Sequence, residues 1–191
     1  MRTKDETKVQ LILQTALKMI ARIGLAGLKM SDLAKEAGVA TGTVYIYFED
    51  KNHLIRELYF YLTHVGTNNS TQQIAENDPL KIKIKKLARN YLDDNINNPE
   101  HSAFLEQYFR SPYFQENGSN RPEEVQLQPI YHLIVEGQRQ SLIKEADPEW
   151  LVMLVCGMLN EVAKVSVYTK KSVTPAEWEL TFSVLWDGIK S

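Results

Sequence analysis

The chain has 191 residues, of which 43% are hydrophobic and 24% charged, and its formal net charge is −2. This length suggests one or two domains, and the hydrophobic fraction is enough for a sizeable core. A single cysteine, Cys156, excludes an internal disulfide and is typical of a reducing cytoplasm, where we therefore expect the protein. No apolar run approaches the 18 residues of a membrane span, and the charged N-terminus lacks the apolar core of a signal peptide.

Charge is unevenly distributed along the chain. Residues 1–56 carry nine Lys/Arg and six Asp/Glu, whereas residues 57–191 carry 13 Lys/Arg and 18 Asp/Glu. The head is therefore net basic by +3 and the remainder net acidic by −5. A basic head on an acidic body is typical of a nucleic-acid-binding module joined to a second domain, although an imbalance of this size also arises by chance.

Residues 8–23 are predicted to form an amphipathic helix. Apolar residues recur at the spacing of one helix face, at Val9, Ile12, Leu13, Ala16, Leu17 and Ile20. Gly24 is expected to end this helix, because glycine readily adopts the conformation of a helix C-terminal cap. Arg2 and Lys4, which precede the helix, are either a phosphate-contacting arm or a solvated tail.

The stretch 30–51 is predicted to form two short helices joined by a tight turn; it reads M-S-D-L-A-K-E-A-G-V-A-T-G-T-V-Y-I-Y-F-E-D-K. Gly38 lies where the chain reverses, since only glycine takes a positive φ there without steric cost. Val44 and Phe48 share the inward face of the second helix, at i and i+4. Hydroxyl, glycine and aromatic residues then face outward or sideways, which is the arrangement of a helix-turn-helix that reads DNA.

The spacing A-x-x-A-G-V-x-x-G-T-V-Y-x-Y-F-x-x-K, from Ala34 to Lys51, resembles the DNA-binding domain of TetR-family transcriptional regulators. The resemblance covers about the first 60 residues. It implies DNA contacts from Thr41, Gly42, Thr43, Tyr45, Ile46, Tyr47 and Lys51, of which Lys51 is expected to contact a phosphate. Lys29 is expected to lie near the DNA backbone and to compensate for the missing charge at Thr41.

Two positions depart from the family pattern. Lys29 stands where a hydroxyl residue usually caps the second helix, and Ala40-Thr41 stands where Ser-Lys is common. Because Ala40 has no side-chain acceptor, we expect Thr41 to cap the recognition helix. These departures argue against copying the family's contacts residue by residue.

A linking helix is expected from Lys51 to about residue 66, capped by Asp50 and fading near residues 68–70. The predicted domains are therefore 1–50, which binds DNA, and 51–191, a helical ligand-binding and dimerisation domain. Helices are expected from Leu80 past Leu92, from Pro99 to about Arg110, and from near Pro129 to Ala146. A breaker-rich loop is expected at 111–123. The lysines at 81, 83, 85 and 86 are interpreted as a solvated face, with a second nucleic-acid patch as the alternative. The chain is thus predicted to be all-α with about nine helices.

The last two helices, starting at Pro148 and Thr174-Pro175, are the most apolar. From 150 to 159 nearly every position is apolar, so this helix is expected to be buried on more than one face. A two-fold dimer, in which each chain gives two helices to a four-helix bundle, would bury the second face of this helix. The residues assigned to that interface are Trp178, Phe182, Leu185 and Trp186.

An apolar effector pocket is expected among the body helices. Its candidate lining is aromatic or soft: Phe104, Tyr108, Phe109, Tyr131, Met153, Met158 and Tyr168. The alternative for each of them is an ordinary core position. The resemblance implies a repressor that a small hydrophobic or amphipathic molecule releases from its operator.

The sequence shows no pattern typical of a metal site, a phosphate-binding loop or a catalytic site. The four histidines are scattered without metal-ligand spacing, no glycine loop suits a phosphate, and no Ser/His/Asp arrangement is present. We therefore predict no metal, no cofactor, no membrane partner and no enzymatic activity. The remaining rival is a DNA-binding factor without a small-molecule ligand, either architectural or controlled by a protein partner.

Overall fold

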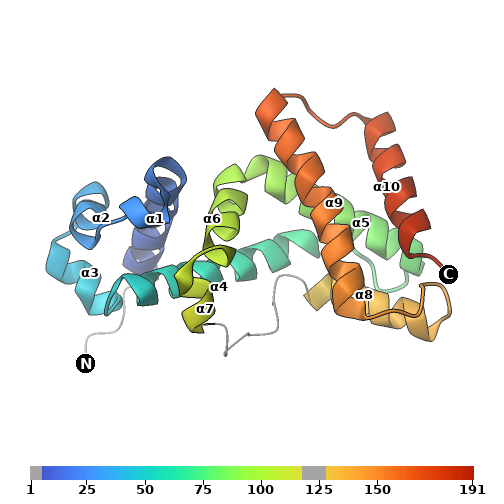
Figure 1. The fold of residues 1–191 in the computed structure, drawn as a ribbon, viewed down its shortest axis with the longest axis horizontal. Helices are drawn as coiled ribbons and strands as arrows, with labels where there is room; N and C mark the ends of the chain where they lie inside the picture. Colours follow the sequence, from blue (N-terminus) through green and yellow to red (C-terminus); the bar gives the residue numbers. More distant parts are fainter. Residues whose placement is uncertain (1–5, 118–127) are drawn as a thin grey trace. The chain divides into compact units, whose positions relative to one another are not determined.

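The computed structural model describes residues 6–117 and 128–191, which form ten helices (Figure 1). Their bounds are α1 Glu6–Gly27, α2 Met30–Glu36, α3 Thr41–Tyr47, α4 Lys51–Ser70, α5 Leu80–Asn97, α6 Pro99–Phe109, α7 Pro112–Asn117, α8 Gln128–Arg139, α9 Pro148–Thr169 and α10 Pro175–Ile189. Within the described residues the only β pairing is an isolated bridge between Ile143 and Lys190. The prediction of an all-α chain is confirmed.

The chain divides into two compact units, and the division differs from the expected boundary at residue 50. The first unit comprises residues 1–62 and 100–121, and the second comprises 63–99 and 122–191. Helix α4 therefore contributes to both units, and α6 and α7 belong with the N-terminal helices. Sequence patterns had placed residues 100–121 in the body, because no local signal states which helices they pack against.

The core of the first unit is built by α1, α2, α3, the first part of α4, and α6. The predicted stripe of α1 is buried from Ile12 to Ile20. Phe104 and Tyr108 of α6 are buried in the same core, and the ring of Tyr108 stacks on that of Tyr59 in α4 at 4.7 Å between centroids. Fully buried aliphatic residues from four helices complete it: Ile12, Ile20, Leu33, Val44, Leu54 and Leu58.

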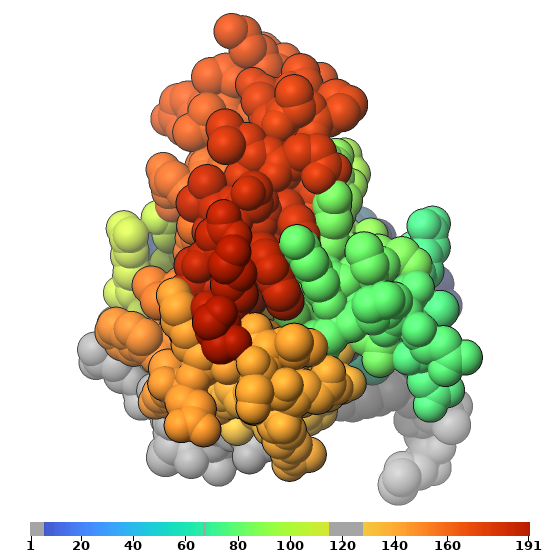
Figure 2. All heavy atoms as spheres, turned by 90° about the vertical axis from the view of Figure 1, so that its right-hand side faces the viewer, coloured from blue at the N-terminus to red at the C-terminus, as the bar shows by residue number. Residues whose placement is uncertain are grey.

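In the second unit, α10 lies beside α5 (Figure 2). The two helices pack through a regular series of cation–aromatic contacts. Lys81, Lys85 and Arg89 lie over the rings of Trp186, Phe182 and Trp178, at 5.3, 5.4 and 5.4 Å from the ring centroids. Both series advance by four residues in opposite directions, because the helices run antiparallel and the i, i+4 spacing puts each series on one face. Lys85 also pairs with Glu179 at 2.6 Å.

This packing places the residues assigned to the dimer interface within a single chain. Trp178, Phe182 and Leu185 are 7%, 3% and 2% exposed, and they lie in the second unit's own core with Trp186 packed against it. The lysines of α5, interpreted from the sequence as a solvated face, cover two of these rings with their side chains. The inward face of α10 is thus already occupied within one chain.

A second apolar surface runs along the opposite face of the last two helices. We call it the outer stripe, and it consists of Trp150, Met153, Leu154, Val165 and Tyr168 on α9 with Leu180 and Val184 on α10. Each is more than half exposed, from 52% at Met153 and Val184 to 92% at Tyr168. The positions recur at three- and four-residue intervals within 150–154, at 165 and 168, and at 180 and 184, and Gly157, Glu161 and Lys164 separate the two groups on α9. Helix α9 was expected to be buried on more than one face; within one chain its second apolar face is exposed, so burial of that face stays a prediction.

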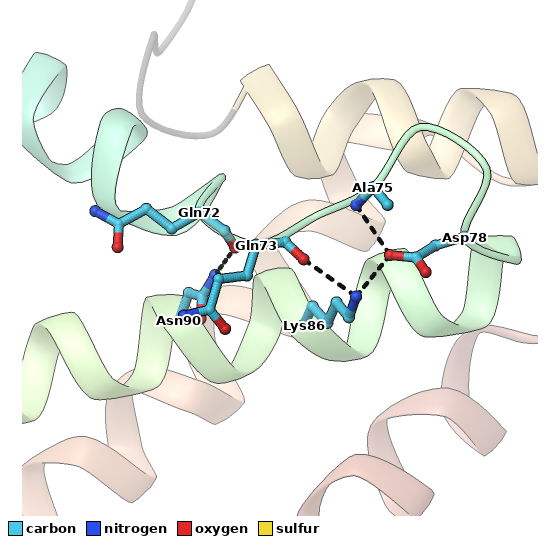
Figure 3. Close-up of polar contacts among 6 residues, drawn as sticks. All are labelled: Gln72, Gln73, Ala75, Asp78, Lys86 and Asn90. Carbon is cyan, nitrogen blue, oxygen red and sulfur yellow. Dashed lines mark hydrogen bonds and ion pairs between the residues drawn. The ribbon is translucent and has the colours of Figure 1, made fainter.

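Lysine and asparagine side chains of α5 hold the segment that connects α4 to α5 (Figure 3). Asn90 donates a hydrogen bond to the carbonyl of Gln72 at 2.7 Å. Lys86 donates to the carbonyl of Gln73 at 3.1 Å and to the carboxylate of Asp78 at 2.7 Å. The hydrogen bond from Lys86 lowers the pKa of Asp78. Lys86 is therefore a structural residue of this connection.

Helix α8 ends at Arg139, seven residues before the predicted end at Ala146. Gly137 allows the chain to fold back at this point, because a Cβ atom there would lie 2.5 Å from Cδ1 of Ile143. Ile143 is buried, and the amide of Lys144 donates to the carbonyl of Ile189 at 2.9 Å. The end of α8 and the C-terminal end of α10 are thereby joined.

Three helices begin at side-chain caps, of which the cap at Asp50 was predicted. The carboxylate of Asp50 accepts from the amide of His53 at 2.8 Å, and that of Asp147 accepts from Glu149 at 2.9 Å. Thr174 and Glu177 form a reciprocal capping box at the start of α10. The predicted loop at 111–123, by contrast, contains helix α7 in its described part, and residues 118–123 lie outside the described residues.

Helices α1 and α9 are long and apolar enough to span a bilayer by length and composition, which the sequence analysis did not anticipate. Each buries one stripe in the core of its own unit. Core helices meet the same criterion, so the finding is weak evidence for a membrane.

Candidate nucleic-acid interface

The turn between α2 and α3 has the predicted geometry. Gly38 has φ +68°, a conformation that favours glycine. The amide of Ala37 donates to the carbonyl of Leu33 at 2.8 Å, and that of Val39 donates to Ala34 at 2.9 Å. These bonds close α2 and set the direction in which α3 leaves the turn.

Helix α3 has one buried and one exposed face. Val44 is fully buried, and Phe48, directly after the helix, is 2% exposed. Tyr45 and Ile46 are 50% and 70% exposed, so two large apolar side chains face solvent on a seven-residue helix. Thr41 and Gly42 are exposed and Thr43 is half-buried. The exposed face therefore offers hydroxyl, backbone and aromatic groups, which suit contacts with phosphates and base edges.

One expectation about this helix is wrong, and one residue of its predicted DNA-binding set is less exposed than its neighbours. Thr41 does not cap it: the cap position is Ala40, without a side-chain hydrogen bond, and Thr41 is the first helical residue. Tyr47 is half-buried and packs against the core of the first unit. Truncating Tyr47 would therefore alter stability as well as any DNA contact, and Tyr45 is the better probe of the exposed face.

Lys51, at the start of α4, lies close to two other segments of the first unit. Its Nζ donates to the carbonyl of Ala26 at 3.4 Å and lies 5.9 Å from the centre of the Tyr113 ring. Burial lowers the pKa of Lys51. Lys29 is exposed at the cap position of α2, where it forms no side-chain capping bond. Arg22 of α1 pairs with Glu36 of α2 at 2.6 Å, but exposed ion pairs contribute little stability.

Tyr113 and Gln107 belong to this unit, although no sequence pattern predicted it. Gln107 accepts a hydrogen bond from the amide of Leu25 at 3.0 Å, directly after Gly24, where α1 departs from helical geometry. Gly24 was expected to end α1, and it does have a positive φ of 75°, but a further turn follows to Gly27. The contacts join residues more than 60 positions apart, so no short pattern could have indicated them.

The seven predicted pocket residues do not form one group. Phe104 and Tyr108 are buried in the core of the first unit, and Phe109 in the same unit is 42% exposed. Tyr131 and Met158 are partly buried against the core of the second unit. Met153 and Tyr168, on the outer stripe, are 52% and 92% exposed.

The interior of the second unit also holds a polar pair. The Tyr91 hydroxyl donates to Oδ1 of Asn160 at 2.9 Å, and burial raises the pKa of Tyr91. Cys156 is buried and forms no disulfide. Among residues 6–117 and 128–191, no group of three or more His, Cys, Asp or Glu could hold a metal ion.

Known proteins resemble the chain in two ways. A family model described as bacterial regulatory proteins, tetR family, matches residues 12–58. An uncharacterized HTH-type transcriptional regulator of Haemophilus influenzae is 28% identical over 173 residues, which cover 91% of this chain and 90% of the relative.

Solved structures share the whole architecture. A TetR family transcription regulator from Marinobacter aquaeolei matches with a TM-score of 0.87 and 20% identity, covering 100% of both chains. FadR of Bacillus subtilis, solved in complex with stearoyl-CoA, matches with a TM-score of 0.77 and 20% identity, covering 94% of this chain and 98% of FadR. At these identities the two structures establish the fold alone.

Proposed function

The chain is a DNA-binding transcriptional regulator of the TetR family, and we propose that it works as a cytoplasmic homodimeric repressor released from its operator by a small amphipathic effector. The exposed face of α3 is the observation that carries this proposal. Tyr45 and Ile46 are exposed while Val44 beside them is fully buried, so one face of the helix packs against the core and the other is exposed to solvent. A recognition helix in the major groove requires this arrangement.

A dimer would place two such helices in successive major grooves, about 34–36 Å apart on a near-palindromic operator. The outer stripe of α9 and α10 supports this assembly. It carries seven large apolar side chains that are each more than half exposed. Pairing the stripe with its copy about a two-fold axis would bury them in a four-helix bundle. The proposed interface therefore replaces Trp178, Phe182 and Leu185 with the residues on the opposite face.

The effector is proposed to bind in the second unit. Tyr131 and Met158, which pack against that unit's core, remain candidates for its lining, and the part-buried pair of Tyr91 and Asn160 offers polar atoms in the same unit. The complex of FadR with stearoyl-CoA supports an amphipathic class of effector, because FadR has the same fold. An effector that binds the DNA-incompetent conformer more tightly lowers operator affinity by the ratio of its two affinities.

The effector is tested by thermal shift followed by DNA titration. The probe DNA is a duplex enriched by the protein from a random pool, and the compounds include stearoyl-CoA, stearate and free CoA. A true effector at a hundredfold excess over its Kd should stabilise the protein by about 2.7 kcal/mol and release the duplex. Stearate and CoA separately test whether the acyl chain or the nucleotide is recognised. If no compound both stabilises the protein and releases DNA, the ligand-free alternative is favoured.

Lys51→Ala is expected to weaken binding to all duplexes alike and to lower the salt dependence of log K by about 1, because a phosphate contact carries no sequence information. Thr43→Val keeps the shape of the side chain but removes its hydroxyl, and it should alter base preference at one position of each half-site. Fluorescence anisotropy across a salt series measures both effects. Lys171→Ala, which removes an exposed charge between α9 and α10, is the control for net charge. A change of base preference in Lys51→Ala without a change in salt dependence would reverse these roles.

A further inference from the structure

Helices α6 and α7 contact the residues around Lys51 in two ways. The first contact is made by Gln107. At Gly24 the backbone of α1 leaves helical geometry, with φ 75° and ψ 164°, so the next amide cannot complete the regular helical pattern. Gln107 supplies an acceptor for this amide, that of Leu25, at 3.0 Å. The bond stabilises the last turn of α1, including the neighbouring carbonyl of Ala26.

The second contact is made to the Lys51 side chain itself. The ammonium donates to the Ala26 carbonyl at 3.4 Å, and the Tyr113 ring of α7 lies 5.9 Å away, within the range of a cation–π contact. Gln107, Leu25, Ala26, Lys51 and Tyr113 therefore form one connected series of contacts. All five belong to the same compact unit.

This arrangement restricts a side chain that is otherwise flexible. A lysine side chain has about four rotatable bonds, and fixing it in one conformation on a phosphate costs conformational entropy. An ammonium has three N–H donors. The Ala26 carbonyl takes one and the ring faces another, which leaves a donor for a phosphate oxygen. A lysine already oriented before DNA binds loses less entropy when the contact forms.

We propose that Tyr113, supported by Gln107, is a positioning residue for the phosphate contact of Lys51, so that α7 is a functional part of the DNA-binding unit. This inference rests on the proposed role of Lys51 and extends it to a segment 62 residues further along the chain. The ring and the Ala26 carbonyl orient the ammonium together, and Gln107 stabilises the turn that carries this carbonyl.

The test is a double-mutant cycle on DNA affinity. Tyr113→Leu removes the ring face and should weaken binding by about two- to fivefold, the range expected for an exposed cation–π contact. The loss should be equal on the enriched duplex and on a scrambled duplex of the same length, because phosphates are common to both. Tyr113→Phe keeps the ring and should bind like the natural protein. Combining Tyr113→Leu with Lys51→Ala should bind no more weakly than Lys51→Ala alone.

A purely structural role for Tyr113 predicts a different pattern. The losses from Tyr113→Leu and Lys51→Ala would then add, and thermal unfolding would account for the weaker binding. That result overturns the proposal, as does unchanged or tighter binding by Tyr113→Leu. Failure of the proposed phosphate contact is distinguishable, because Lys51→Ala itself would then bind like the natural protein. Gln107→Leu is the second variant, and its smaller loss should likewise vanish when Lys51 is alanine.

Discussion

A double variant, Leu154→Glu with Leu180→Glu, is expected to sediment as a single chain of 21.9 kDa at micromolar concentration, whereas the natural protein should sediment at twice that mass. The two leucines are 55% and 65% exposed on α9 and α10, so a protomer tolerates charge there. In a symmetric interface each carboxylate would be buried without a partner, and the cost would be doubled by the two-fold axis.

The affinity for the operator should fall when dimerisation is lost. A monomer engages one half-site at a time and loses the effective concentration that links the second, so a loss of about a hundredfold or more is expected. The matched control is Leu142→Glu, at a residue of similar exposure (44%) outside α9 and α10. This control should remain dimeric and bind DNA normally. A double variant that stays dimeric would show that the outer stripe is not the interface.

Phe182→Ala is expected to lower the free energy of unfolding by about 3–5 kcal/mol, because it leaves a cavity in the core. Phe182 is 3% exposed and lies between the rings of Trp178 and Trp186, at 5.9 and 6.4 Å between centroids, with Lys85 over its face. The loss should appear in urea unfolding at every protein concentration, since the contacts lie within one chain.

Val184→Ala is the matched comparison, two residues away on the same helix and 52% exposed. It should change the unfolding of a protomer by less than about 0.5 kcal/mol, as surface substitutions usually do. Its effect should instead be a weaker dimer, visible as an unfolding midpoint that depends more steeply on protein concentration. The reverse pattern, in which Phe182→Ala abolishes the dimer and leaves protomer stability unchanged, would restore the inward face of α10 as the interface.

The sequence by itself determined what depends on neighbouring residues. Helical periodicity located most helices, Gly38 located the turn with positive φ, and Asp50, Pro148 and Thr174-Pro175 located three helix starts. The spacing from Ala34 to Lys51 was enough to indicate the helix-turn-helix, because buried and exposed positions of a short helix follow directly from the helical period.

Tertiary structure decided which apolar face of a helix meets which partner. Helices α9 and α10 each carry two apolar faces, and periodicity cannot rank them. The side chains of Lys81, Lys85 and Arg89 cover the aromatic face of α10 from α5, almost a hundred residues away, which leaves the other face exposed. In the same way, α6 and α7 joined the DNA-binding unit through contacts at Leu25, Tyr59 and Lys51. Which face of a helix packs against which partner depends on contacts between residues far apart in the sequence, and local sequence patterns do not indicate these contacts.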